Sequence, residues 1–151
     1  MKYVTIASTV LIALFVSCKK EQEVPVLRKA VVVEKNLSKE CYLGIINKDT
    51  FSMSLEIKGN EISSGELNYN FFEKDKNEGT LAGELKGDTL FADYTFTSEG
   101  VSSVREVAFL KKGNTYTEGF GDIVENNGKV VFKNAKQLKF GKLVLSKVDC
   151  K

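Results

Sequence analysis

Three charged side chains, those of Arg105, Glu118 and Asp122, occupy positions that regular strand pairing would turn toward an apolar interior. A two-residue turn at Gly113-Asn114 makes the facing pairs Phe109–Glu118, Val107–Phe120 and Arg105–Asp122. A buried charge is costly unless it is paired. The three residues therefore form a structural ion pair at one end of the fold or a polar grip inside a ligand cavity, unless the true register differs.

A ligand cavity would need further groups from the same interior. Tyr94 and Tyr116 would add hydroxyl groups. Apolar walls would come from Phe96, Phe109 and Phe120. Binding pockets have this mixture of apolar walls and a few polar groups, but so do ordinary cores. The ligand-binding candidates are thus Tyr94, Arg105, Tyr116 and Glu118, with a structural role as the alternative.

The chain contains no histidine, which excludes Ser-His-Asp and Cys-His catalysis, zinc-protease motifs and histidine-based metal sites. A retaining glycosidase would need two carboxyls about 5 Å apart, and in this register Glu106 and Glu118 point to opposite faces. The net charge is only +2, without the basic patch of a nucleic-acid binder. We therefore expect no enzymatic activity, no cofactor, no metal site and no nucleic-acid partner.

The elements that must position these residues are strands. Apolar and polar residues alternate strictly from Phe51 to Ile57, and no long segment has a helical period. Turn signals such as Gly59-Asn60, Gly87-Asp88 and Asn127-Gly128 recur along the chain. This pattern predicts an all-β, antiparallel meander of about eight strands. Closure into a small barrel would remove the exposed edges, and a two-sheet sandwich is the alternative.

Two hairpins give specific register predictions. The turn at Gly87-Asp88 pairs Leu85 with Leu90, Gly83 with Ala92 and Leu81 with Tyr94, all on one apolar face. The turn at Gly59-Asn60 pairs Ile57 with Ile62, but Leu67, Tyr69 and Phe71 then have the wrong parity. One extra residue would restore it, so we predict a β-bulge at Gly65.

The N-terminus reads as an export signal. Lys2 precedes an apolar run from Val4 to Val16 that is too short to span a membrane. The run Leu14-Phe15-Val16-Ser17-Cys18 resembles the lipobox of bacterial lipoproteins, although Phe15 stands where leucine is usual. The resemblance implies cleavage after residue 17 and acyl chains such as palmitate on Cys18, which would anchor the protein to a membrane. The alternative is a secreted protein that uses Cys18 in a disulfide.

With Cys18 lipidated, Cys41 and Cys150 remain as an even pair in an oxidising compartment. A disulfide between them would close a loop of just over a hundred residues, worth about 4–5 kcal/mol on the chain-entropy model. It would also hold the first strand near the chain end, as barrel closure requires. We expect a signal peptide at residues 1–17, a lipidated tether at 18–38 and a β-barrel at 39–151.

The segment from Cys41 to Cys150 resembles a recurrent group of small bacterial lipoproteins of uncharacterised function. The resemblance lies in Gly87 to Tyr94, in Ser98-Glu99-Gly100 with Ser103 and Arg105, in Glu118 to Gly121 and in Lys147 to Cys150. It implies architecture and location only. More distantly, the chain is similar to the envelope-sensing and copper-resistance barrel lipoproteins, but it lacks their Cys-x-x-Cys.

These observations predict a non-enzymatic envelope lipoprotein whose barrel binds a small or lipid-like ligand. The expected location is the outer membrane, on its periplasmic or surface face, with the membrane as one partner through the acyl chains. The alternative is an interaction or inhibitor lipoprotein that contacts an envelope protein through its loops, such as Ser98 to Ser103.

Overall fold

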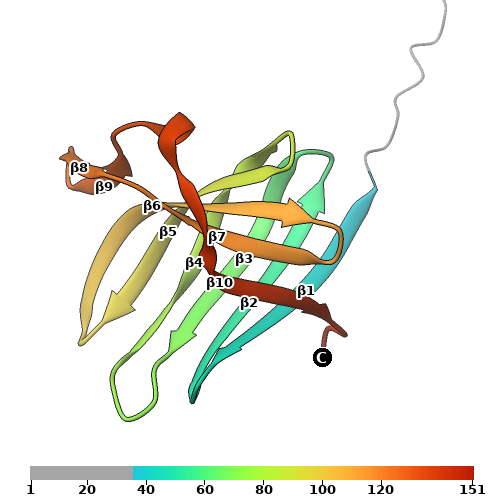
Figure 1. Cartoon of the computed structure of the whole chain (residues 1–151), viewed down its shortest axis with the longest axis horizontal. Helices are drawn as coiled ribbons and strands as arrows, with labels where there is room; N and C mark the ends of the chain where they lie inside the picture. The colour runs from blue at the N-terminus through green and yellow to red at the C-terminus, as the bar shows by residue number, and fades with distance from the viewer. Residues whose placement is uncertain (1–35) are drawn as a thin grey trace, which may run out of the picture. The chain divides into compact units, whose positions relative to one another are not determined.

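The computed structural model describes residues 36–151, which are almost entirely strand and turn (Figure 1). The strands are β1 (Leu37–Ile46), β2 (Asp49–Lys58), β3 (Glu61–Asn70), β4 (Lys76–Lys86), β5 (Thr89–Ser98), β6 (Val101–Lys112), β7 (Thr115–Phe120), β8 (Ile123–Asn126), β9 (Lys129–Phe132) and β10 (Lys139–Val148). One short 3₁₀ helix, η1 (Ala135–Gln137), precedes β10. Among the described residues no helix is long and apolar enough to cross a membrane.

The expected signal segment and Cys18 lie outside the described residues, as does the tether up to residue 35. Leu37 and Ser38, which the sequence places in the tether, already belong to β1. The ordered β domain therefore begins slightly earlier than predicted.

Eight of the strands close into an antiparallel barrel, in the order β5-β4-β3-β2-β1-β10-β7-β6. The closure is made by β5 and β6, which pair continuously from Thr89–Leu110 to Ser98–Val101. A sandwich would leave this seam open, so the predicted barrel is confirmed. The chain runs as a meander through β7, then forms the β8–β9 hairpin outside the barrel, and returns as β10 between β7 and β1 (Figure 1).

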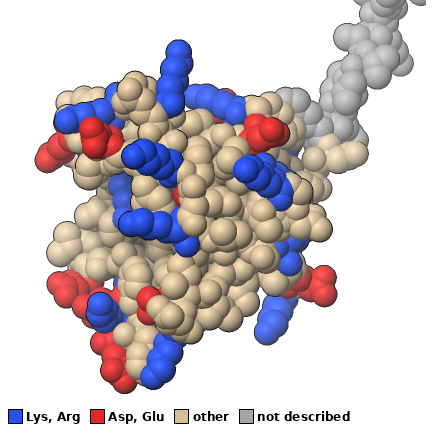
Figure 2. Space-filling model, viewed as in Figure 1, with Lys and Arg blue, Asp and Glu red and all other residues tan. Residues whose placement is uncertain are grey.

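Alternation puts the apolar residues inside the barrel. Phe51, Met53, Leu55 and Ile57 of β2 are all buried, while charged side chains lie over the outer surface (Figure 2). Glycine permits close strand approach on β4, where a Cβ at Gly83 would collide with the carbonyl oxygen of Phe91. Large side chains fill the interior, including Tyr42, Tyr94, Phe109 and Tyr116.

The hairpin registers predicted at Gly87-Asp88 are confirmed, including the pairs Leu85–Leu90 and Leu81–Tyr94. A bulge is also present between β2 and β3, but the extra residue is Ser63 rather than Gly65. Beyond it Leu67 and Tyr69 turn inward, as the parity argument required, and both are buried. Gly65 is needed for a different reason, because a Cβ there would lie 2.9 Å from Cβ of Leu81.

The register predicted for the Gly113-Asn114 hairpin is wrong beyond its first pairs. Phe109 does face Glu118, but β6 and β7 pair only from residue 109 to 112 of β6. Strand β7 ends at Phe120, and farther back along β6 its place is taken by β9, which pairs in parallel with Val104 and Arg105. The predicted pairs Val107–Phe120 and Arg105–Asp122 therefore do not form.

The predicted disulfide between Cys41 and Cys150 is present, and it joins two cysteines that are 109 positions apart in sequence. It lies beside the seam between β1 and β10, whose ladder is only three residue pairs long, Cys41–Val148 to Leu43–Ser146. The β1–β2 and β5–β6 ladders, by comparison, are each ten pairs long. The cross-link thus reinforces a short closure of the barrel.

Candidate functional site

The barrel wall opens where β6 changes partners. Between the part of β6 that pairs with β7 and the part that pairs with β9 lies a crevice of about 240 Å³. Its sides are mostly apolar and come from Val107, Phe120, Ile123, Val130 and Phe132. Two ionisable side chains of the candidate set, Arg105 and Glu118, line the same crevice. The wall opening therefore gives access to groups that a continuous ladder would cover.

Arg105 is held among aromatic rings. Its guanidinium carbon lies 5.2 Å from the ring centre of Tyr69, 5.4 Å from that of Tyr94 and 5.3 Å from that of Phe96. Such cation–π contacts attract the guanidinium to the ring faces and partly replace its contacts with water. The Nε atom is nevertheless buried without a hydrogen-bond partner. Within residues 36–151 no carboxylate forms an ion pair with Arg105.

Glu118 is 8% exposed and accepts a 2.6 Å hydrogen bond at Oε1 from the hydroxyl of Tyr69. Burial raises the pKa of Glu118, and the hydrogen bond from Tyr69 and the positive charge of Arg105 only partly oppose this. Burial also raises the pKa of Tyr69, with the neighbouring carboxylate adding to the effect. Both Glu118 and Tyr69 therefore hold their protons more strongly than they would in water, and both lie beside the guanidinium of Arg105.

Tyr69 was not among the residues selected from the sequence. The sequence nevertheless indicated that Tyr69 points inward, because the predicted bulge turns both Leu67 and Tyr69 toward the interior. The sequence could not indicate the contact between Tyr69 and Glu118, since β3 and β7 are not neighbours in the sheet.

Tyr94 lies beside Arg105, but its polar group is already used. Its hydroxyl donates a 3.0 Å hydrogen bond to the carbonyl oxygen of Asn77, and its ring stacks on Phe96 at 4.8 Å. Burial raises the pKa of Tyr94 to about 12, although Arg105 acts in the opposite direction. Tyr94 thus contributes a ring to the site rather than a free hydroxyl.

Tyr116 belongs to a different cluster. Lys111 lies six residues farther along β6 than Arg105, about 20 Å at the usual rise of a strand, and its Nζ is 5.4 Å from the ring centre of Tyr116. The rings of Tyr116 and Tyr42 pack edge to face at 4.9 Å. The hydroxyl of Tyr116 is buried without a partner.

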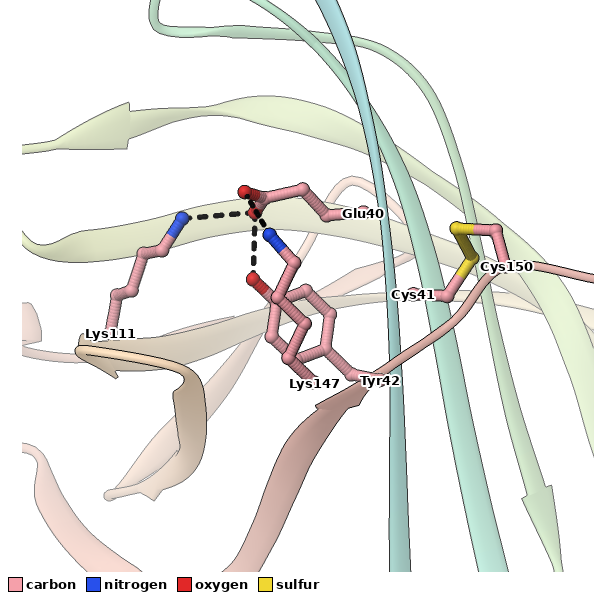
Figure 3. Close-up of polar contacts among 6 residues, drawn as sticks. All are labelled: Glu40, Cys41, Tyr42, Lys111, Lys147 and Cys150. Atoms are coloured by element: carbon pink, nitrogen blue, oxygen red, sulfur yellow. Dashed lines mark hydrogen bonds and ion pairs between the residues drawn. A yellow bond between two sulfur atoms is a disulfide. The ribbon is translucent and has the colours of Figure 1, made fainter.

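Glu40 organises this second cluster (Figure 3). Its Oε2 accepts hydrogen bonds from the Tyr42 hydroxyl at 2.7 Å and from Lys111 Nζ at 2.9 Å, and its Oε1 accepts one from Lys147 Nζ at 2.9 Å. Burial by itself would raise the pKa of Glu40, but these hydrogen bonds outweigh it and lower the pKa to about 2. The cluster lies close to the Cys41–Cys150 disulfide (Figure 3). Because Glu40, Tyr42, Lys111 and Lys147 satisfy one another, we assign this cluster a structural role beside the disulfide.

Two residues expected inside the barrel lie outside it. Asp122 follows the end of β7 and is exposed, and Phe120 is 41% exposed. Glycine is required at positions 119 and 121, because a Cβ would lie less than 3 Å from Phe140 at Gly119 and from Leu138 at Gly121. The predicted grouping of Arg105, Glu118 and Asp122 is therefore reduced to Arg105 and Glu118.

The chain was compared with protein-family models, curated protein sequences and solved structures. None of the three comparisons finds a match. The chemistry must therefore be argued from the site. Within the part of the chain that the structure describes, no group of three or more acidic or cysteine side chains is placed to hold a metal ion. The crevice offers an unsatisfied guanidinium donor, a carboxyl whose pKa is raised by burial, and apolar walls.

Proposed function

We propose that this protein is a membrane-anchored envelope lipoprotein whose barrel is a non-enzymatic binding module for a small or lipid-like ligand. The crevice at Arg105 and Glu118 is the binding site. The observation that carries the proposal is the buried Nε of Arg105, which has no hydrogen-bond partner. A buried donor without an acceptor is destabilising, and a ligand acceptor would relieve that penalty.

The chemistry of the crevice selects an acidic, partly apolar ligand. A guanidinium binds carboxylates through two parallel hydrogen bonds, and Arg105 has no protein carboxylate paired with it. Glu118 in its protonated form would tolerate a second carboxylate nearby, whereas an ionised Glu118 would repel it. The walls of Val107, Val130 and Phe132 suit an apolar body. The volume of about 240 Å³ indicates a short ligand.

The envelope location rests on the lipobox at Cys18 and on the signal segment before it. The Cys41–Cys150 disulfide supports an oxidising compartment.

Native mass spectrometry tests the proposal. The full chain is extracted from bacterial membranes in a mild detergent, and the mass of retained small molecules is measured. We expect a retained acid in the wild type that is lost in R105M, which keeps the length of the apolar stem. The matched control is K112M on the same strand, because Lys112 is exposed and lies outside the crevice. An adduct that survives in R105M, or that is absent from both wild type and control, contradicts the proposal.

An interaction or inhibitor role through the barrel loops is the second candidate. The turn between β5 and β6 favours it, because Val101 is 65% exposed beside Glu99 and Gly100. Substituting Glu99 by alanine should then abolish capture of an envelope protein without changing stability. If E99A captures the same proteins as the wild type, the loop is not a contact.

A further inference from the structure

A second and larger crevice, of about 880 Å³, lies where β7 ends, η1 turns and β10 begins. It is lined by Phe120, Asp122, Lys133, Gln137, Lys139 and Lys142, among others. It borders the Arg105 crevice at Phe120 and Gly121, but neither Arg105 nor Glu118 lines it. The two crevices therefore have different chemistry and can be tested separately.

The lysine crevice carries an unbalanced positive charge. The side chains of Lys133, Lys139 and Lys142 are exposed, and none of them forms an ion pair with another residue of the described segment. Asp122 is the one carboxylate among the residues that line it. Figure 2 shows the face that carries η1 and β10, where blue side chains lie toward the middle and most red ones at the edges. The crevice thus has more cations than anions.

Backbone geometry keeps this crevice open. Residues 141–143 of β10 stand against the single residue Glu118 of β7, so β10 bulges here, and Gly141 has a φ of 152°. On the other side the amide of Lys133 donates a 2.8 Å hydrogen bond to the carbonyl oxygen of Asp122. The Asn134 side chain caps η1 by accepting from the amide of Lys136. The lysines are therefore carried on segments fixed by these backbone contacts.

We infer that the lysine crevice binds a phosphate-type oxyanion, borne by a soluble small molecule or by a lipid headgroup. Lysine acts as a point charge with three rotatable donors and binds phosphate without needing the planar fork that arginine gives to a carboxylate. Three lysines around one crevice match the several oxygens of a phosphate. Gln137 adds a side-chain amide donor. An extended acidic peptide would instead match lysines spaced along a strand edge.

The test uses the full chain in neutral-detergent micelles and follows backbone amide resonances by NMR. Inorganic phosphate is the first probe. Micelles containing phosphatidylglycerol, with phosphatidylcholine micelles as reference, are the second. The variant K133Q/K139Q/K142Q removes the three lysines. The matched control K58Q/K76Q/K112Q removes the same charge from exposed lysines on other strands. Unchanged resonances elsewhere in each variant show that the barrel is folded.

We expect saturable shifts at Gly121, Gly141 and Lys142 on addition of phosphate or of the anionic lipid. A single exposed ion pair between lysine and phosphate is weak, but three such pairs add together. The affinity for phosphate or anionic lipid should therefore fall about tenfold or more in the crevice variant and stay unchanged in the control. Shifts from phosphate identify a soluble ligand as sufficient, and shifts from phosphatidylglycerol alone identify a lipid headgroup. Equal loss in both variants, no saturable shift with either probe, or shifts produced only by a glutamate-rich peptide would overturn the inference.

Discussion

Tyr69 on β3 donates its hydroxyl hydrogen to Oε1 of Glu118 on β7 at 2.6 Å, although the two strands are not neighbours in the sheet. The contact crosses the barrel interior and joins residues 49 apart in sequence. It fixes the carboxyl beside Arg105, which also lies over the ring of Tyr69. One tyrosine thus positions both ionisable groups of the proposed ligand site.

Replacing Tyr69 by phenylalanine leaves the buried carboxyl of Glu118 without its donor. We expect a loss of about 1–3 kcal/mol in the free energy of unfolding, measured by urea denaturation. The pKa of Glu118 should rise further, because a hydrogen bond that favours its ionised form is removed. Y94F is the matched control, since Tyr94 donates to a backbone carbonyl instead. A Glu118 pKa unchanged in Y69F, followed by carboxyl NMR, would contradict this assignment.

Glu118 makes stability depend on pH in a predictable direction. Burial raises its pKa in the folded state above the ordinary value of 4.5, so the fold favours the protonated carboxyl. This contribution is fully present below about pH 4.5 and is lost as the pH rises through the folded pKa. In E118Q the group stays neutral. The stability of the wild type relative to E118Q should therefore fall as the pH is raised, and a flat difference would refute the assignment.

Glu40 should show the opposite dependence. Hydrogen bonds from Tyr42, Lys111 and Lys147 lower its pKa to about 2, so its contribution is present above pH 4.5 and is lost as the pH falls toward 2. We expect E40Q to be destabilised by about 2 kcal/mol at neutral pH and to lack this loss on acidification. Thermal unfolding at a series of pH values measures both effects. E84Q is the control, because Glu84 forms only an exposed ion pair with Lys86.

Tyr116 should tolerate loss of its hydroxyl. The group is buried without a hydrogen-bond partner, so Y116F removes an unsatisfied polar atom and keeps the ring packed against Tyr42. We expect the free energy of unfolding to stay the same or to rise by up to about 1 kcal/mol. Y42F, which breaks a hydrogen bond to Glu40, should instead lose about 1–3 kcal/mol. A comparable loss in Y116F would show that its hydroxyl has a partner after all.

Much of the barrel could be predicted because its information is local. The alternation from Phe51 to Ile57 decides which face of β2 is buried, and the Gly87-Asp88 turn decides the register of β4 and β5. The Cys41–Cys150 disulfide followed from cysteine number and from the closure that a barrel needs. The break in alternation after Ile62 predicted a bulge at Gly65, two residues from the extra residue at Ser63.

The candidate site could be predicted only in part, and the misplacement of Asp122 comes from the assumed register. The register from Gly113-Asn114 was extended to Asp122, but β7 stops at Phe120. Phe140 of β10 and Leu138 just before it leave no room for a side chain at Gly119 and Gly121. Gly119 and Gly121 were the available sequence signal that the regular strand pairing ends here. No sequence pattern indicated that β9 would then pair in parallel with Arg105.

By itself the sequence determined the all-β class, the inward face of most strands, the disulfide, and Arg105 and Glu118 as two of the candidate site residues. Only the tertiary structure decided that β6 exchanges β7 for β9, that the wall opens there, and that Tyr69 reaches Glu118 across the interior. The physical reason is that period and turn chemistry act between near neighbours in the chain. The partner of a strand that ends early is instead selected by competition among distant segments for the same backbone donors and the same space.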